Sequence, residues 1–418
     1  MNVLTAAQAR LAKDFPALTH QNFKYFWIGQ CLSLLGTWMQ RTAQQWLVYD
    51  MTKSPLLLGL LGAAQFGPVL FLSLFAGVLV DRYPKKKILF VTQTVLMLQA
   101  IIFALLVMTG YIRYWHILVL AAVMGFANTL DMPTRQSFII ELVGKRDLMS
   151  GIALNSAIVN LAKIIGPALA GLVITFLGTA ACLFLNGLSF IAVLIGLFYI
   201  KTDFIAIRPK NGRVLDDVVE GIKYITANKM LGGAVLAMLA VGTFAFNSNI
   251  IMPVFAREVL HKQVSGYSFL LSAMGLGSFI AALVVSSRSN KGPNKQALFG
   301  SAIILCIFYM LLGLVHNYYM SLIILAIIGF FSVSFMTTVN TTIQLNSDDL
   351  HRGRAMSVYS LALMGTSPIG NLFAGGITEK LGSNAGFFTC GAIALLLLVP
   401  IMVGIRNRST NSEKATLS

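Results

Sequence analysis

The stretch GVLVDRYPKKK, from Gly77 to Lys87, decides how the rest of the chain is interpreted. An apolar run ends at Val80, a charged turn with three consecutive lysines follows, and a second apolar run begins at Ile88. A turn of this kind is typical of two membrane-spanning helices that are joined on the cytoplasmic side, where lysine and arginine gather. The sequence therefore predicts an integral membrane protein.

The whole chain has the composition of a multi-pass membrane protein. Of its 418 residues, 57% are hydrophobic and 11% are charged, and the mean hydropathy is +0.78. We expect an all-α protein with twelve transmembrane helices, because twelve apolar runs are long enough to cross a bilayer. These runs are 23–49, 56–80, 88–109, 114–139, 150–176, 179–200, 230–255, 267–286, 297–315, 319–345, 355–378 and 385–405.

The distribution of basic residues predicts the orientation. The chain has 31 lysines and arginines against 15 acidic residues, a formal net charge of +16. When loops are assigned to alternate sides, most basic residues fall on the side of both termini, and the other side keeps Lys53, Arg113, Arg257, Lys262 and Lys380. Both termini are therefore predicted to be cytoplasmic. Topology and attraction to anionic membrane lipids explain the basic balance, so we expect no nucleic-acid partner.

A polar insertion at 201–229 separates the first six apolar runs from the last six. We expect a first six-helix bundle with a short cytoplasmic N-terminal segment (1–200), a cytoplasmic linker (201–229), and a second six-helix bundle with a short polar tail (230–418). Val218, Ile222 and Ile225 lie at helical spacing within 214–226. This spacing predicts an amphipathic helix in the linker.

The two halves also resemble each other. Small residues of the fifth span match small residues of the eleventh at a constant offset of 204 positions: Gly166, Ala170 and Gly171 match Gly370, Ala374 and Gly375. Small residues at equivalent places indicate close helix packing in both halves. Two pseudo-symmetric six-helix bundles are typical of transporters that rock around a site at the midplane.

The opening stretch carries a recognisable motif. Gly77-x-x-x-Asp81-Arg82-x-x-Lys85-Lys86 resembles the signature between spans two and three of the major facilitator superfamily, whose fold is the two-bundle architecture predicted above. The resemblance implies that this turn is a cytoplasmic latch between the bundles. Asp81 can lie at the positive N-terminal end of the helix that starts near Gly353, and Arg82 or a following lysine can pair with Glu141. The alternative is a basic turn that only sets topology.

Further motifs narrow the resemblance. They are Thr52-x-Ser54-Pro55-x-x-x-Gly59, Asp131-x-Pro133-Thr134-Arg135-Gln136, Ala153-x-Asn155-Ser156 and Gly166-Pro167-Ala168-x-x-Gly171. They are similar to segments of the enterobactin-exporter and macrolide-efflux branch, which implies a bacterial inner-membrane exporter of siderophores or drugs, driven by the proton gradient. The segment with Gly166, Pro167 and Gly171 is also similar to the antiporter motif of the fifth span. It predicts a helix kink, with packing alone as the alternative.

Charged residues within the spans are the sharpest indication of function, because each costs several kcal/mol unless it is paired or hydrated. They are Arg41, Asp131, Arg135 and Lys163, with Glu141 near a helix end. Asp131 can pair with Lys163 on the next span or with Arg135 one turn away. Asp131 is interpreted either as a proton-carrying carboxylate or as half of a permanent salt bridge.

The predicted substrate cavity has a polar and aromatic stripe in the first span. Trp38, Gln44 and Gln45 share a helical face with Arg41. Arg41 and Lys163 against one carboxylate favour an anionic or polyoxygenated ligand. Packing is the alternative role for the predicted lining residues of the second half, which are Phe244, Asn247, Asn340, Gln344 and Tyr359.

No enzyme or metal constellation is found in the sequence, and no P-loop, so we expect no cofactor and coupling to an ion gradient, that of protons. The predicted protein is a proton-coupled exporter of a siderophore or an amphiphilic drug-like molecule, working by alternating access in a bacterial cytoplasmic membrane. Its expected partners are a small anionic or amphiphilic substrate and membrane lipids, and we expect a monomer. An importer or uniporter on the same fold is the main alternative, and a membrane sensor or scaffold is another.

Overall fold

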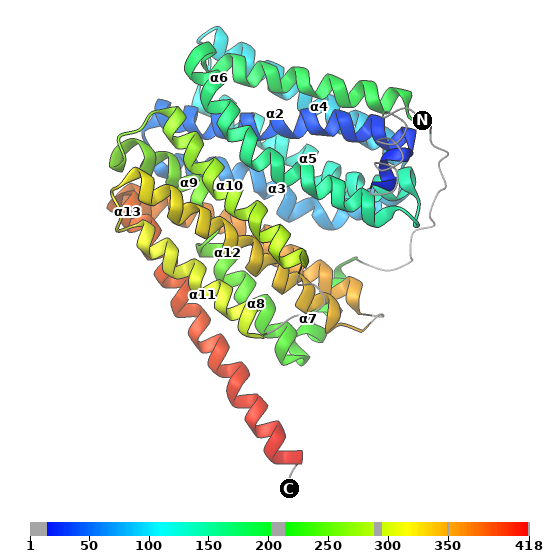
Figure 1. The fold of residues 1–418 in the computed structure, drawn as a ribbon, viewed down its shortest axis with the longest axis vertical. Helices are drawn as coiled ribbons and strands as arrows, with labels where there is room; N and C mark the ends of the chain where they lie inside the picture. Colours follow the sequence, from blue (N-terminus) through cyan, green and yellow to red (C-terminus); the bar gives the residue numbers. More distant parts are fainter. Residues whose placement is uncertain (1–14, 202–213, 288–294, 349–350, 417–418) are drawn as a thin grey trace, which may run out of the picture. The chain divides into compact units, whose positions relative to one another are not determined.

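The computed structural model describes residues 15–201, 214–287, 295–348 and 351–416, without the side chains of residues 73–75, 77, 78, 81, 214–218 and 405–416. The described residues form helices and no strand (Figure 1). In chain order the elements are η1 (Pro16–Thr19), α2 (Gln21–Thr52), α3 (Pro55–Arg82), α4 (Lys85–Met108), α5 (Tyr114–Val143), α6 (Leu148–Tyr199), α7 (Val214–Ala227), α8 (Lys229–Phe244), α9 (Ser248–Val254), η2 (Phe255–Val259), α10 (Val264–Ser287), α11 (Lys295–Leu312), α12 (Tyr318–Leu345) and α13 (Arg352–Thr416).

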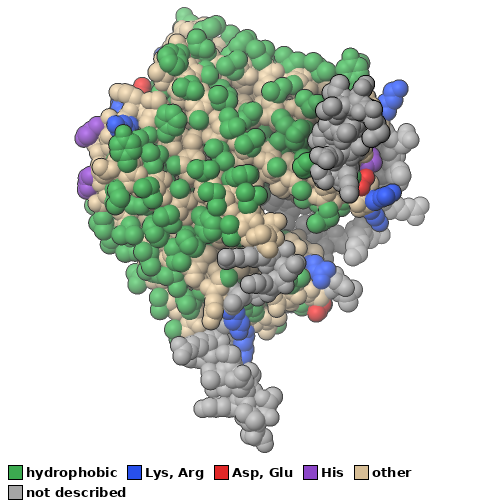
Figure 2. Space-filling view, in the orientation of Figure 1, with side chains coloured by type: hydrophobic (Ala, Val, Ile, Leu, Met, Phe, Trp, Pro, Cys, Tyr) green, Lys and Arg blue, Asp and Glu red, His purple; other side chains and the backbone are tan. Residues whose placement is uncertain are grey.

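The protein is a multi-pass membrane protein. Within the described ranges, nine helical stretches are long and apolar enough to cross a membrane. The 32-residue α2 is not one of them, because Gln40, Arg41, Gln44 and Gln45 make it more polar. On the face shown in Figure 2, hydrophobic side chains cover most of the described surface, and charged side chains are few. This distribution fits a surface that is surrounded by lipid.

Two of the helices are longer than any bilayer requires. α6 contains Gly178 with φ 84°, and α13 contains Gly382 with φ 82°. Each glycine interrupts the helical geometry, and a residue with a side chain rarely adopts this φ. The two glycines are 204 positions apart, which is the offset of the small-residue repeat. Each of these long elements is therefore a pair of helices joined at a glycine.

The chain divides into two compact units. Unit 1 contains residues 1–47 and 71–210, and unit 2 contains residues 48–70 and 211–418. The last turn of α2 and the first half of α3 thus belong to unit 2, although the sequence assigns them to the first bundle.

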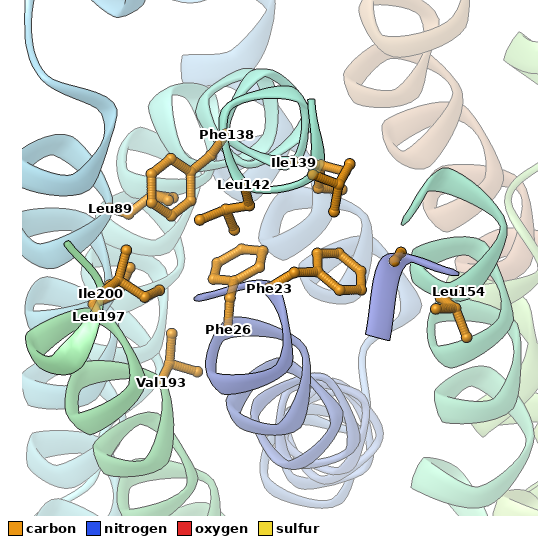
Figure 3. Packing of buried hydrophobic residues seen from close by; sticks show 12 residues of the cluster. Phe23, Phe26, Leu89, Phe138, Ile139, Leu142, Leu154, Val193, Leu197 and Ile200 are labelled. Atoms are coloured by element: carbon orange, nitrogen blue, oxygen red, sulfur yellow. The ribbon is translucent and has the colours of Figure 1, made fainter. Parts of the chain in front are cut away.

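One end of unit 1 is organised by a buried cluster of hydrophobic residues from η1, α2, α4, α5 and α6 (Figure 3). Phe26 and Phe138 are both at most 1% exposed, and their rings meet edge to face with centroids 5.4 Å apart. Val193 and Leu197, near the end of α6, lie on one side of Phe26, and Leu142 lies on the other. This packing fixes the ends of the helices whose middle parts carry the buried charges.

Unit 2 contains a very close helix crossing. A Cβ atom on Gly277 of α10 would lie 1.7 Å from the carbonyl oxygen of Ala326, and one on Gly329 of α12 would lie 1.9 Å from that of Met274. Such distances exclude any side chain, so both positions require glycine. Close packing of backbones is the usual way in which helices associate in a membrane.

The seventh apolar run, predicted as one span at 230–255, is interrupted. α8 ends at Phe244, α9 begins at Ser248, and the π-helix η2 follows. The side chain of Asn247 donates a hydrogen bond to the carbonyl of Thr243 over 2.5 Å, in competition with the backbone. Gly370 of α13 packs against the same carbonyl, where a Cβ atom would be 2.1 Å away. An inserted side chain is therefore the physical reason for the break.

The linker helix α7 contacts the start of α13 within unit 2. Glu220 forms an ion pair with Arg354, and the Tyr224 ring stacks on His351 with centroids 4.5 Å apart. Gly221 packs on the carbonyl of Arg354, where a Cβ atom would be 2.8 Å away. The helix expected at 214–226 is present as Val214–Ala227.

Candidate functional site

Asp131 of α5 is the buried acid among the described residues, with 1% of its surface exposed. Thr92 Oγ1 and Gln93 Nε2 of α4 donate hydrogen bonds to its Oδ1 over 2.8 and 2.7 Å. Arg135, one turn along α5, forms an ion pair with its Oδ2. Three donors therefore surround the carboxylate, which offsets the cost of burying its charge.

The pairing of Asp131 settles which of the two predicted partners it contacts. Arg135 is four residues away on the same helix, a spacing at which side chains meet. Lys163 has its ammonium group over the Trp38 ring instead. Thr92 and Gln93 were not among the predicted site residues, although two adjacent polar residues in the apolar run of α4 are a usable signal. Two neighbouring side chains of α4 are thus hydrogen-bonded to Asp131.

Two cations lie against a single tryptophan in unit 1. Arg41 and Trp38 are three residues apart on α2, and Arg41 Cζ is 5.0 Å from the centroid of the Trp38 ring. Lys163 Nζ, from α6, is 5.9 Å from the same centroid. Among the described residues neither cation forms an ion pair with an acid, and Arg41 Nε is buried with no hydrogen-bond partner. The cluster of Trp38, Arg41 and Lys163 therefore holds uncompensated positive charge.

Gly166, from the antiporter-like segment of α6, seats this tryptophan. A Cβ atom on Gly166 would lie 2.5 Å from Trp38 Cβ and 3.3 Å from the carbonyl oxygen of Leu35. The glycine therefore lets α6 approach α2 closely, and Lys163, three residues earlier, lies on the same side of α6. Pro167 and Gly171 are buried, and α6 stays helical through both, with non-helical dihedral angles at Gly178.

A chain of amide side chains holds α2 in place beside the cluster. Asn186 of α6 donates to Gln40 Oε1 over 2.7 Å, and Gln40 Nε2 donates to Gln99 of α4 over 3.0 Å. Gln99 in turn donates to the carbonyl of Leu120 on α5 over 3.3 Å. These buried bonds connect four helices and orient the turn of α2 next to Arg41.

The predicted lining residues Gln44 and Gln45 follow Arg41 on α2. Gln44 is 1% exposed, and its Nε2 atom is buried with no hydrogen-bond partner among the described residues. Gln45 is half-buried. Unsatisfied buried atoms such as Gln44 Nε2 and Arg41 Nε are expected where water or a ligand supplies the missing partner.

The lysines of the turn between α3 and α4 make specific contacts inside unit 1. Lys85, which is 8% exposed, forms an ion pair with Glu141 at the end of α5. Lys86 donates to the carbonyl of Ile200 over 2.6 Å, at the C-terminal end of α6. Cations are favourable at helix C-termini. Arg82 is exposed, and the surroundings of Gly77 and Asp81 lie outside the described residues, so the latch role of this turn stays a prediction.

The predicted lining residues of the second half make contacts within unit 2. The Phe244 ring meets Phe373 edge to face with centroids 5.0 Å apart. The Asn247 side chain donates its hydrogen bond to the Thr243 carbonyl at the helix break. Gln344 donates to Asn340 over 2.7 Å, and Tyr359, 4% exposed, donates to the carbonyl of Met336 over 3.4 Å. Ring packing and hydrogen bonds to nearby residues explain why these side chains are present. That they line a substrate cavity stays a prediction.

The start of α3 is capped by Glu379, an acid that was not among the predicted site residues. Ser54 Oγ accepts the N–H of Leu57 over 3.3 Å, and Pro55 is the first residue of the helix, where no N–H is needed. Glu379 of α13 accepts both the Ser54 hydroxyl over 2.8 Å and the N–H of Leu56 over 3.1 Å. A carboxylate at a helix N-terminus stabilises it electrostatically.

Glycines bring α3 and α13 together just beyond this cap. A Cβ atom on Gly59 would be 2.5 Å from the carbonyl oxygen of Asn371, and one on Gly62 would be 2.4 Å from the Asn371 amide. On the other side, a Cβ atom on Gly375 would be 2.6 Å from the carbonyl oxygen of Pro55. The motif from Thr52 to Gly59 is thus explained by a cap followed by a close helix contact.

The end of α2 is tied to the same unit by polar pairs. Asp50 contacts Lys53 over 2.8 Å and Arg257 of η2 over 3.3 Å. The Tyr49 hydroxyl donates to Glu258. These contacts explain why residues 48–70 cluster with unit 2.

A groove of about 760 Å³ lies between α7, α8 and α13 in unit 2. Its lining is apolar, with Ile222, Leu236 and Leu239 among its residues, apart from Thr226, Asn228 and Lys229. A ligand site normally has a few convergent polar groups that orient the ligand. The cluster around Trp38 meets this description better, so we treat it as the candidate site.

Comparison with known proteins identifies the protein family of this chain. The family described as "Transmembrane secretion effector" matches residues 12–418. The staphyloferrin A transporter of Staphylococcus aureus (strain NCTC 8325 / PS 47) is 26% identical over 364 residues, covering 84% of this chain and 87% of that protein. The enterobactin exporter EntS of Shigella boydii serotype 4 (strain Sb227) is 22% identical over 391 residues, covering 92% and 93%. The predicted resemblance to the enterobactin-exporter branch is confirmed.

Solved structures share the fold. The nucleoside transporter NupG superimposes with a TM-score of 0.73 at 10% sequence identity, covering 91% of this chain and 98% of the other. At this identity the likeness concerns the arrangement of helices and carries no information on the substrate.

Proposed function

The chain belongs to the transmembrane secretion effector family of major facilitator transporters, and from that premise we propose that it exports a small organic molecule of the siderophore type in exchange for protons. The relatives named above support this proposal, since one is named as a siderophore transporter and one as a siderophore exporter. Family membership also agrees with the expectation that the protein is not an enzyme.

The observation that carries the proposal is the uncompensated charge within the membrane helices of unit 1. Arg135 is neutralised by Asp131, whereas Arg41 and Lys163 lie against Trp38 without an acidic partner among the described residues. Ionisable residues within membrane helices are rare, and they mark the pathways of substrates and ions. A positive cluster attracts anionic or polyoxygenated solutes and repels cationic drugs, so a siderophore fits better than a cationic amphiphile.

The finer architecture is also part of the proposal. If α6 and α13 each contribute two spans, separated at Gly178 and Gly382, and α2 crosses the membrane despite its polar stripe, the number of spans is twelve. With the basic turns on the inner side, both termini are cytoplasmic in a bacterial cytoplasmic membrane. The two bundles then give alternating access to a site near the midplane.

We assign the coupling proton to Asp131. Protonation would remove the negative charge that holds Arg135 and would leave a guanidinium free to reorient in the low-dielectric interior. Arg135 NH1 and Gln93 Oε1 are buried with no hydrogen-bond partner in the described part of the chain, so the network has capacity for water. The competing interpretation is a permanent salt bridge that only holds the bundle together.

Transport into inside-out membrane vesicles tests this function. Vesicles with an acidic lumen should accumulate an iron-free carboxylate siderophore such as staphyloferrin A, and an uncoupler should abolish the accumulation. Vesicles from cells that lack the protein are the control. Uptake in the opposite orientation that ignores the uncoupler would establish an importer or uniporter, and the absence of transport of any solute together with binding of a partner protein would establish a sensor.

A further inference from the structure

We propose that Arg41 and Lys163 form the two arms of a binding site for a small organic dianion, with Trp38 between them. The inference rests on the proposed transport function, and it names the chemical class of substrate that the site accepts: a molecule with two carboxylate or equivalent anionic groups separated by a few carbon atoms.

The geometry of the two cations sets the size of this ligand. Arg41 Cζ and Lys163 Nζ lie 5.0 and 5.9 Å from the same ring centroid, so the charges are separated by no more than about 11 Å, the sum of these distances. A flexible molecule of a few carbon atoms spans such a distance. One anionic end then meets the planar fork of the guanidinium, which holds a carboxylate with two hydrogen bonds, and the other meets the ammonium group.

The electrostatics of the two cations favour a negative partner. Two like charges near each other inside a membrane protein are costly, and contact with the face of one tryptophan recovers only part of that cost. Asp131 cannot supply the missing charge, because Arg135, Thr92 and Gln93 already occupy its two oxygens. The buried Nε of Arg41 has no acceptor among the described residues. An anion between Arg41 and Lys163 would supply both an acceptor for this atom and the negative charge that the two cations lack.

The site is also built to stay in place. Gly166 admits Trp38 so closely that a methyl group would collide with it. The hydrogen bonds from Asn186 through Gln40 to Gln99 fix the neighbouring turn of α2. A preorganised pair of cations favours a ligand with two fixed charges over two separate monoanions, because the second contact costs little additional freedom.

Ligand binding to the purified full-length protein tests the inference. Succinate (a dianion), butyrate (a monoanion with the same number of carbon atoms) and succinamide (neutral) are titrated at constant ionic strength by calorimetry. We expect succinate to bind at least about tenfold more tightly than butyrate, and succinamide not to bind, since each additional charge-assisted contact contributes about a factor of ten. Equal binding of all three probes would overturn the proposal.

Variants identify the two arms. Arg41→Gln and Lys163→Gln should each weaken succinate binding about tenfold and bring the succinate-to-butyrate ratio close to one. Lys53→Gln is the matched control, because Lys53 is an exposed cation paired with Asp50 and should leave both values unchanged. Variants that fold, as judged by size exclusion, and that keep the wild-type ratio would refute the assignment. If a variant does not fold, the ratio of succinate affinity to butyrate affinity in the wild-type protein still tests whether the site prefers a dianion.

The outcomes separate this inference from the proposed function. A protein that exports a siderophore with protons but shows no preference for the dianion keeps its function and loses this site. A protein that binds succinate through Arg41 and Lys163 but moves no solute keeps the site and loses the transport function.

Discussion

Removing the charge of Lys163 should make the ligand-free protein more stable. In Lys163→Met the side chain keeps nearly its length, so packing changes little, while the repulsion from Arg41 disappears. At a separation of at most about 11 Å this repulsion is about 1.5 kcal/mol or more, for an effective dielectric constant of about 20. Loss of the contact with Trp38 lowers the free energy of unfolding by about 1 kcal/mol. The variant also no longer buries an ammonium group, which raises the free energy of unfolding, by less than the several kcal/mol of a rigid site because the surroundings of Lys163 can relax.

The expected net gain is about 1 to 3 kcal/mol. Each kcal/mol raises the melting temperature by about 2 to 4 °C for a cooperative unit of this size, so the expected rise is about 2 to 12 °C. Thermal unfolding in detergent without added organic anions measures it. Lys53→Met is the control: the exposed pair of Lys53 with Asp50 contributes at most about 0.5 kcal/mol, so its melting temperature should stay constant. Transport should be lost in Lys163→Met, a combination typical of functional positions. A lower melting temperature would refute the reasoning, since it would mean that the charge of Lys163 is already compensated.

Four further outcomes are expected. Asp131→Asn should abolish proton-driven transport while the protein still inserts, and wild-type transport rates in vesicles would remove this residue from coupling. Asp81→Asn should slow turnover if its turn is a latch, and unchanged turnover would leave the turn with a topological role. Gly166→Ala should cost about 1 to 3 kcal/mol, measured by thermal unfolding, because the new methyl group meets Trp38. Glu379→Gln should cost about 0.5 to 1 kcal/mol through the weakened cap of α3, and an unchanged melting temperature would contradict this.

Apolar length predicted the helices well, because a bilayer imposes a minimum length on every span. The break at Asn247 escaped prediction, since its cause is the competition of one amide side chain for the carbonyl of Thr243. Nothing in hydropathy reports such local competition. Likewise, nothing in the local sequence around Ser54 predicts that the acid that caps α3, Glu379, lies 325 positions later in the chain.

The charged residues of the site could be found from the sequence, but their pairing could not. Their position within apolar runs indicated Arg41, Asp131, Arg135 and Lys163. Position along the runs does not decide whether Asp131 pairs with Arg135 or with Lys163. Rotation of α6 about its axis decides the choice. That rotation is fixed by the contact of Gly166 with α2, a packing detail that requires coordinates.

The cap on α3 has a consequence for how the protein is made. Ser54 is synthesised early, and its carboxylate partner Glu379 leaves the ribosome only after most of the chain has been inserted. Until then the N–H of Leu56 lacks its carboxylate partner, and the glycine face of α3 is uncovered. We therefore expect assembly in the membrane to finish late, and truncation before α13 to expose the hairpin to membrane proteases.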